Sequence, residues 1–384
     1  MAASRLLRLA VLVWIAALWF GARVLAQAPA ATPAPGVPEL TLDTGREIFE
    51  AACVACHGPD AKGQPQTTLG FEPPATFPDF ADCNGSTRER TWDWRAIIHE
   101  GGPRRGFSDI MPSFGEALTL GQIDKVMAYL REQCPDPAWP LGELNLPRPL
   151  FTEKAFPEDE WVVQSAINAN GTGAVANKII YEKRFGARNQ IEIVAPFSVR
   201  QSDAGAWAGG VGDVVAGYKR VLFGSLGTGS VVSVVGEAAI PTGHQERGLG
   251  LGVPKFETFG AFGQLLPRLS FIQLQVGGEL PTDAEEAPRA AFGRLAFGKS
   301  FAEDQSFGRL WTPIVEVLVD RDFEAHAHTS WDIVPQFQVS LNRRQHVRLN
   351  IGVRQPLRNT DNRSRQVVFY ALWDFFDGGL RDGW

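Results

Sequence analysis

Cys53-Val54-Ala55-Cys56-His57 is the stretch of this 384-residue chain that says most about its fold. Two cysteines separated by two residues and followed directly by histidine form the C-x-x-C-H pattern of c-type haem attachment. On one helical turn, both thiols can add to the two vinyl groups of one porphyrin, and the next imidazole then points at the iron. A redox pair of cysteines that happens to precede a histidine is the alternative. The motif predicts one covalent haem c on Cys53 and Cys56, with His57 as an iron ligand.

Two helices are expected around this motif. Residues 44–54 lead into it, and residues 120–133 carry an apolar stripe with helical spacing. Each stretch starts at a threonine, or just after one, that suits a helix N-cap. Gly45 permits the close approach of another helix, and Tyr129 is expected to pack on the surface formed by Gly45 and Phe49.

A methionine on a loop is the candidate for the second iron ligand. Pro112 disfavours helical geometry at Met111 and keeps it on a loop, 54 residues after His57. The thioether of such a loop methionine is a good axial ligand, and it raises the reduction potential. Met127 has core spacing in a helix and is expected to pack. His99 is a further candidate ligand, although a hydrogen-bonded surface histidine explains it as well.

Other residues near the motif have two interpretations each. Arg95, Arg104 and Arg105 either pair with haem propionates through bidentate hydrogen bonds or are ordinary solvated arginines. Trp92 and Trp94 either wall a haem pocket or fill the core.

Residues 41–134 resemble the small class I cytochromes c. The shared features are a helix leading into C-x-x-C-H-G, a Met-Pro-x-Phe loop and a last helix ending Ala-Tyr-Leu-Arg. The resemblance implies an all-α cytochrome c domain with His57 and Met111 as axial ligands of the haem iron. It also implies electron transfer, so the protein is expected to be an electron carrier rather than an enzyme.

Cys83 and Cys134 are not part of the haem motif. In an oxidising compartment they are expected to form a disulfide, and two free thiols are the alternative. A bridge across about 50 residues stabilises a fold by about 4 kcal/mol in the chain-entropy model.

The ends of this domain carry segments of distinctive composition. Residues 1–26 have the features of a signal peptide: arginines, a short apolar run and small residues at a cleavage site. An uncleaved anchor is the alternative. Residues 27–40 form an Ala/Pro-rich tether, and residues 135–150 contain five prolines and form a stiff linker. The net charge of −6 argues against nucleic acid as a partner.

Residues 151–384 are expected to form about twelve antiparallel strands. Period-2 alternation of apolar and polar residues is clear at 190–193, 271–276, 335–342 and 347–354. The predicted strands are long, and short connections mostly alternate with long ones, as in bacterial outer-membrane barrels. We therefore expect a multidomain protein whose cytochrome domain is followed by an up-and-down β-barrel. A soluble β-domain is the alternative, because alternation alone does not distinguish the two.

Two further features support a membrane barrel. The polar positions of the strands include Glu192, Arg294, Glu316, Arg348 and Arg354, which a lumen can pair or hydrate. The segment 212–219 resembles the Gly-Asp-x-x-x-Gly-x-Lys signature of the phenol meta-degradation transporter-like family of outer-membrane proteins. That resemblance implies a barrel but leaves its cargo open.

Two loop features are weaker candidates for sites. His326 and His328 stand two residues apart on a long loop, and a surface metal site there lacks a third ligand fixed by spacing. Asp283, Glu285 and Glu286 are best explained as a solvated acidic loop.

The favoured function is electron transfer by a single haem that an outer-membrane barrel anchors in the periplasm. Its partners are expected to be membrane lipid and a periplasmic or extracellular redox protein. One alternative is a porin or transporter with a haem domain as regulator or plug. A haem peroxidase-like enzyme is the other, but it needs an open iron position, which Met111 closes.

Overall fold

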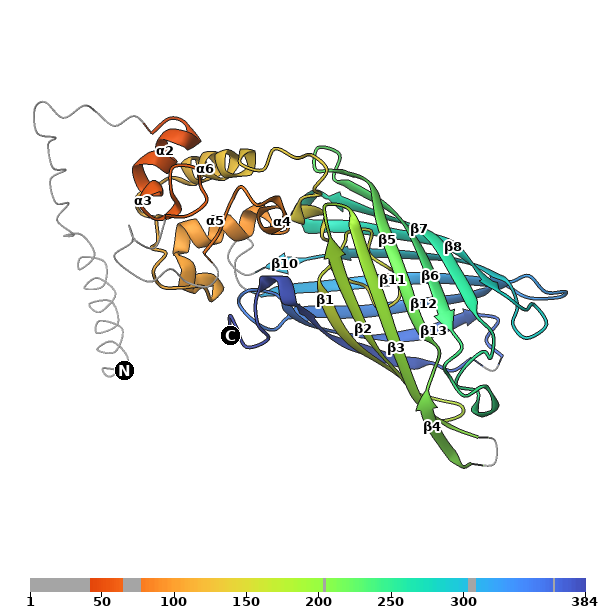
Figure 1. Cartoon of the computed structure of the whole chain (residues 1–384). Coiled ribbons are helices and arrows are strands. Elements are labelled where there is room, and N and C mark those ends of the chain that lie inside the picture. Colours follow the sequence, from red (N-terminus) through yellow and green to blue (C-terminus); the bar gives the residue numbers. More distant parts are fainter. Residues whose placement is uncertain (1–41, 65–76, 203–204, 303–308, 362) are drawn as a thin grey trace, which may run out of the picture. The chain divides into compact units, whose positions relative to one another are not determined.

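The structure is a computed structural model that describes residues 42–64, 77–202, 205–302, 309–361 and 363–384. The predicted signal peptide and tether, residues 1–40, lie outside these ranges. In the described chain, helices come first and strands follow from residue 160 onward (Figure 1). None of the described helices is long and apolar enough to cross a membrane.

The helical region is small. It contains five short α-helices and two 3₁₀ turns among the described residues: α2 Gly45–Ala52, α3 Val54–His57, α4 Cys83–Ser86, α5 Thr91–Glu100, η1 Gly102–Arg105, α6 Leu120–Glu132 and η2 Gly142–Leu144.

Helices α2 and α6 begin at threonine N-caps, as the sequence predicts, and each cap belongs to a capping box. The Thr44 side chain accepts from the Glu47 amide, and the Thr119 side chain accepts from the Gln122 amide. The two helices pack closely, because a Cβ on Gly45 would lie 2.0 Å from the backbone oxygen of Lys125. The Phe49 and Tyr129 rings lie 5.3 Å apart at this crossing, which confirms their predicted contact.

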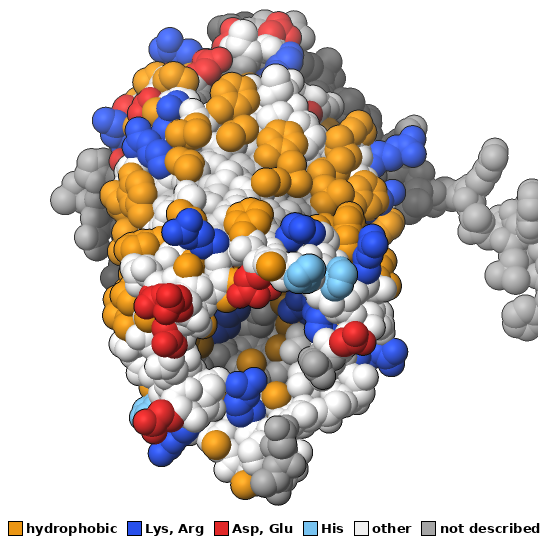
Figure 2. Space-filling view, turned by 90° about the vertical axis from the view of Figure 1, so that its right-hand side faces the viewer, with side chains coloured by type: hydrophobic (Ala, Val, Ile, Leu, Met, Phe, Trp, Pro, Cys, Tyr) orange, Lys and Arg blue, Asp and Glu red, His pale blue; other side chains and the backbone are white. Residues whose placement is uncertain are grey.

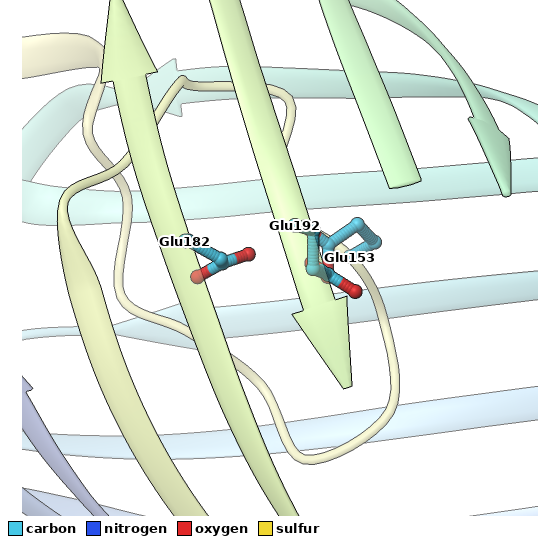
Figure 3. A group of neighbouring side chains, drawn as sticks. All are labelled: Glu153, Glu182 and Glu192. Atoms are coloured by element: carbon cyan, nitrogen blue, oxygen red, sulfur yellow. The ribbon is translucent and has the colours of Figure 1, made fainter. Parts of the chain in front are cut away.

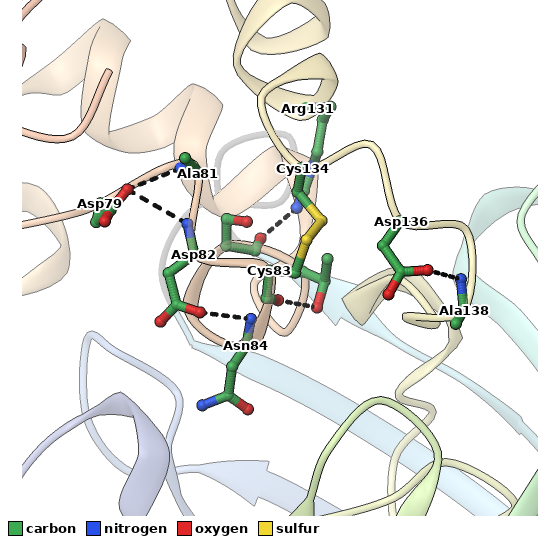
Figure 4. The surroundings of a disulfide bond; sticks show 11 residues. Asp79, Ala81, Asp82, Cys83, Asn84, Arg131, Cys134, Asp136 and Ala138 are labelled. Carbon is green, nitrogen blue, oxygen red and sulfur yellow. Dashed lines mark hydrogen bonds between the residues drawn. A yellow bond between two sulfur atoms is a disulfide. The ribbon is translucent and has the colours of Figure 1, made fainter. Parts of the chain in front are cut away.

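A disulfide joins Cys83, at the start of α4, to Cys134, after the end of α6 (Figure 4). The two Cα atoms are 5.1 Å apart and 51 residues separate them in the chain. The side chain of Asp82 accepts from the Asn84 amide at 3.0 Å and caps α4 beside the bridge. The bridge therefore ties the loop region after the haem motif to the last helix.

Twelve long antiparallel strands form a closed barrel, as expected. Strand β14 pairs with β1, and β9 pairs with β11, so the ring has no open edge. The short strands β4 Trp207–Val211 and β10 Phe301–Ala302 are additions to it. The twelve are β1 Glu160–Asn168, β2 Ala174–Phe185, β3 Asn189–Gln201, β5 Val214–Ser225, β6 Ser230–Ile240, β7 Lys255–Leu266, β8 Ser270–Pro281, β9 Ala290–Lys299, β11 Leu310–Asp322, β12 Ser330–Ser340, β13 Val347–Arg358 and β14 Gln366–Asp374.

The two faces of the barrel wall have opposite character. On β11, Val315 is 42% exposed on the outer face, whereas its neighbour Glu316 is fully buried. On β13, Ile351 is exposed and Asn350 is buried. Figure 2 looks onto the end with the longer connections and shows charged side chains around a hollow, with hydrophobic side chains gathered on the flank. The apolar side chains of the strands thus point outward and many polar ones point inward.

Part of the chain before β1 lies inside the barrel. Residues 144–159, here called the lumenal segment, run across the boundary between the predicted linker, 135–150, and the predicted barrel, 151–384. Leu144 and Phe156 pack in one cluster with inward residues of β5, β6, β7 and β9, and Leu150 packs in another with residues of β1, β2, β12 and β14. The apolar side chains of this segment are therefore buried against the barrel wall.

Candidate functional site

A single cavity of about 530 Å³ brings the four predicted haem residues together. Cys53, Cys56, His57 and Met111 all line it, and it is called the thiol cavity here. Neither cysteine is in a disulfide. A volume of this size is typical of ligand and cofactor sites, which are mostly apolar with a few placed polar groups. The structure thus brings together residues that the sequence separates by more than 50 positions.

The environment of the His57 imidazole favours its neutral form. Burial lowers the pKa of His57 to about 4, so the ring is uncharged at neutral pH. It stacks on Phe77 at 5.4 Å and packs against Phe80 at 5.5 Å. Its buried Nδ1 has no hydrogen-bond partner among the described residues. A neutral imidazole in an apolar setting is the form that binds a metal.

The two thiols are held on one side of the cavity by the short helix α3. Burial, and then the neighbouring Cys56, raise the pKa of Cys53 to about 11. The helix forms because the amides of Cys56 and His57 both reach back to the carbonyl of Cys53. Backbone hydrogen bonds within this turn therefore hold the motif residues in place.

Met111 reaches the cavity from a loop that is tied to the end of α5. The Gly102 amide donates to the Met111 carbonyl at 3.0 Å, and the Phe114 amide donates to the Ile98 carbonyl at 2.9 Å. A Cβ on Gly102 would lie 2.0 Å from the Ser108 oxygen, so only glycine allows this loop to close. The sequence alone did not reveal this requirement for Gly102.

The remaining walls are mainly apolar and aromatic. Trp94 lines the cavity and also belongs to the helical core. Sequence reasoning did not assign several lining residues to the cavity: Phe77, Phe80, Ile97, Phe107 and Phe114. It also missed Phe376 and Asp377, which come from beyond the last strand and left no local signal.

The other candidates for iron ligands or propionate partners do not line the cavity. Met127 is a buried core residue, as its spacing predicts. His99 lies 2.5 Å from the Glu100 carboxylate and does not line the cavity. Arg95 pairs with Asp124. Arg105 is buried against Asp93 at 3.0 Å, so this arginine neutralises a carboxylate of its own domain.

Residues 41–130 match the family model of cytochrome C oxidase, cbb3-type, subunit III. This match identifies a cytochrome domain, and such a domain implies haem binding. The thiol cavity fits that group, because two free thiols, a neutral imidazole and a thioether line one apolar space.

Among solved structures, this chain matches outer-membrane proteins at low sequence identity. A COG4313 outer membrane channel from Pseudomonas putida F1 has a TM-score of 0.41 and 12% identity, covering 59% of this chain and 99% of that chain. The NanC porin has a TM-score of 0.40 and 9% identity, covering 56% and 98%. The beta domain of the Bordetella autotransporter BrkA has a TM-score of 0.35 and 12% identity, covering 56% and 97%. No curated protein matches the chain.

The lumenal segment is bound to the barrel wall on several sides. Glu316 on β11 accepts from the amides of Leu150 and Thr152 at 2.6 and 2.9 Å. Tyr370 on β14 donates to the Arg148 carbonyl at 2.6 Å. Further bonds come from β3, β6, β8 and β12. The segment therefore spans the interior rather than following one strand.

Charged side chains reinforce this contact. Arg148 pairs with Glu182 at 2.6 Å, and Lys219 pairs with Glu153 at 2.6 Å. Glu153 of the segment lies beside Glu182 and Glu192, which belong to β2 and β3 (Figure 3). Glu182 and Glu153 are thus each paired with a cation, Arg148 of the lumenal segment and Lys219 of β5. The loop histidines His326 and His328 are exposed and belong to no cluster of three metal-ligand side chains among the described residues.

The cytochrome domain is also in contact with the barrel. Arg88, near the end of α4, forms an ion pair with Asp159, which directly precedes β1, and both side chains are almost fully buried. Arg90 donates to Gln345 at 2.5 Å, and Arg344 donates to the Gly106 carbonyl at 2.8 Å. These contacts join the ends of α4 and η1 and the start of α5 to the residue before β1 and to the turn between β12 and β13.

Proposed function

We propose that this protein is an electron carrier with one covalent haem c, anchored in the outer membrane by its barrel. Cys53 and Cys56 hold the haem through thioether bonds, and His57 and Met111 are the axial ligands of its iron. The single observation that carries this proposal is that all four side chains line the thiol cavity. The haem iron supplies a one-electron couple, and the partner is a periplasmic or extracellular redox protein.

The residues of the cavity favour electron transfer over catalysis. His57 and Met111 together fill both axial positions and leave none for a substrate such as peroxide. Trp94, Ile98 and Phe114 give the cavity an apolar wall. A thioether ligand and an apolar pocket both favour the reduced state. The cytochrome domain is therefore suited to accept and release an electron without binding a substrate.

The outer surface of the barrel supports a place in a membrane. Strands of 9 to 13 residues match the length that a tilted strand needs to cross a bilayer. Their outward positions carry exposed apolar side chains such as Val163, Ile193, Val276 and Ile351. A closed barrel satisfies all of its backbone hydrogen bonds internally, which lipid requires.

The connections favour a periplasmic location for the cytochrome domain. The turns at residues 186–188, 226–229 and 267–269 are short, and the connections at 241–254 and 359–365 are long. Short turns face the periplasm in bacterial barrels. The start of β1 is at the same end as the short turns, so the domain that precedes it lies on that side.

The lumenal segment favours an anchor over an open pore. A porin keeps a water-filled channel, whereas residues 144–159 cross this lumen and bond to strands on several sides.

Haem staining after denaturing electrophoresis tests the proposal. The full chain is produced in a host that attaches haem c, and we expect a stained band that Cys53→Ala and Cys56→Ala abolish. Cys83→Ser with Cys134→Ser is the matched control, which removes two other cysteines and keeps the stain. Absence of covalent haem in the wild-type chain overturns the proposal.

Membrane fractionation and a heat-modifiable gel mobility test the anchor. We expect the haem-stained band in the outer-membrane fraction, with a mobility that changes on boiling. Protease added to intact cells should leave the haem domain uncut, and protease added after outer-membrane permeabilisation should cut it. A stained protein in the soluble fraction contradicts the anchor but leaves the haem assignment intact.

A further inference from the structure

The chain beyond the last strand contributes to the thiol cavity. The 3₁₀ turn η6 Phe375–Asp377, here called the C-terminal turn, follows β14 directly. Phe376 and Asp377 of this turn line the same cavity as Cys53 and Met111. The proposed haem site therefore includes residues from both ends of the described chain.

The C-terminal turn is held in place by contacts on both sides. The Phe375 amide donates to the Asp159 carbonyl at 3.0 Å, and Arg344 donates to the Asp377 carbonyl at 2.9 Å. The guanidinium of Arg88 lies 4.4 Å from the centre of the Phe376 ring. The turn is thus positioned by the barrel on one side and by the cytochrome domain on the other.

A second carboxyl group meets Asp377 in the cavity wall. Glu89, which follows α4, also lines the thiol cavity. Burial, and then the charge and hydrogen bond of Glu89, raise the pKa of Asp377 well above its usual range. Asp377 therefore retains its proton at pH values where a lone aspartate would lose it, and Glu89 is its hydrogen-bond partner.

We propose that Asp377 and Glu89 form a proton-binding pair of the haem site, which takes up a proton on reduction and releases it on oxidation. The inference rests on the proposed haem function. One electron from the redox partner converts Fe(III) to Fe(II) and removes one positive charge from the cavity. A proton from solvent then binds the carboxyl pair and restores the charge, so no further reactant is needed.

The surroundings of the pair are mixed in charge. Carboxylates and guanidinium groups both face it, from α5, from η1, from the segment after α4, from α6, from the β12–β13 turn and from the end of β14: Asp93, Arg105, Arg88, Arg131, Arg344 and Asp374. The arginines favour ionisation of the pair and the aspartates oppose it. Asp79 and Asp82 also line the cavity, but their side chains accept from the backbone amides of Ala81 and Asn84. The exchangeable proton is therefore assigned to Asp377 and Glu89, which line the cavity beside each other.

The test is a spectroelectrochemical titration of the full-length haem-loaded protein in detergent from pH 5 to pH 9. In the wild type, the midpoint potential should fall as pH rises, by at most about 59 mV for each tenfold drop in proton concentration. Asp377→Asn and Glu89→Gln should each flatten this slope over part of the range. Glu132→Gln, an exposed residue that does not line the cavity, is the matched control and should keep the wild-type slope.

The outcomes separate this inference from the proposed function. Absence of haem bands at all pH values overturns the proposed function itself. Haem bands with the same slope in the wild type, Asp377→Asn and Glu89→Gln overturn only the proton-binding pair. If Asp377→Asn does not fold, as judged by gel mobility, Glu89→Gln decides alone, because Glu89 belongs to the cytochrome domain rather than to the barrel.

Discussion

Glu316 on β11 accepts a hydrogen bond from the backbone amide of Leu150 at 2.6 Å. The same carboxylate accepts from the next two amides of the lumenal segment, those of Phe151 and Thr152, at 3.1 and 2.9 Å. Buried backbone donors need partners, and here one buried side chain serves three of them. The binding of the lumenal segment inside the barrel therefore depends strongly on this one residue.

Glu316→Ala should destabilise the folded barrel by about 3–5 kcal/mol, because it leaves several buried donors without an acceptor. The measurement is the temperature at which heating abolishes the gel mobility that is characteristic of the folded barrel. Val315→Ala is the matched control, since the neighbouring side chain points outward and is 42% exposed. Equal loss of stability in the two variants would contradict the role assigned to Glu316.

The filled lumen should make the wild-type protein a poor conductor. Reconstituted in a planar lipid bilayer, it is expected to show no steady conductance of the size seen for open porins. The double variant Arg148→Ala with Glu316→Ala loosens the lumenal segment at two places and should increase conductance. Steady porin-like current through the wild type would show that residues 144–159 do not block the barrel.

Met111→Ala should open one axial position of the haem iron. Carbon monoxide should then bind the reduced protein, and the midpoint potential should fall, because a thioether ligand favours Fe(II). Absorption spectra with and without carbon monoxide provide the measurement. Met127→Leu is the control, because that methionine is packed in the core. Carbon monoxide binding by the unaltered reduced protein would exclude Met111 as a ligand.

Loss of the Cys83–Cys134 disulfide should destabilise the cytochrome domain. The bridge closes 51 residues, which corresponds to about 4 kcal/mol in the chain-entropy model. Cys83→Ser with Cys134→Ser should lower the denaturant midpoint, followed by haem absorbance, and the compact gel form of the barrel should persist. An unchanged midpoint, with the wild-type bridge verified by mass spectrometry, would contradict this expectation.

His346 should make stability depend on pH. Burial lowers its pKa from 6.5 to about 4, and its ring lies against the Gly379 carbonyl at 3.2 Å. The unfolded chain therefore binds more protons between these pH values, so stability is full above pH 6.5 and decreases as pH falls toward 4. We expect a loss of about 1 kcal/mol between pH 7 and pH 5 from this residue. Thermal unfolding at the two pH values measures it.

His346→Gln should reduce that pH dependence, and His328→Gln should not, because His328 lies exposed on a loop. Identical pH dependence in the wild type and His346→Gln would assign the effect to other groups.

Local patterns in the sequence were enough for the outline of the protein. The C-x-x-C-H motif and the threonine caps of α2 and α6 each depend on residues within one or two turns of each other. The alternation of apolar and polar residues likewise predicts the barrel, because one face of each strand must meet a different environment from the other. Such features depend on short-range geometry, which spacing alone reveals.

Only the tertiary structure decided what fills the barrel and what completes the thiol cavity. Leu144 and Leu150 stand in a proline-rich stretch that has the composition of a linker, yet they are buried against strands that follow far later in the chain. Asp377 meets Glu89 across almost 290 residues. Contacts of this kind form because the sheet closes between β1 and β14. The periodicity of the sequence does not indicate which distant side chains this closure brings together.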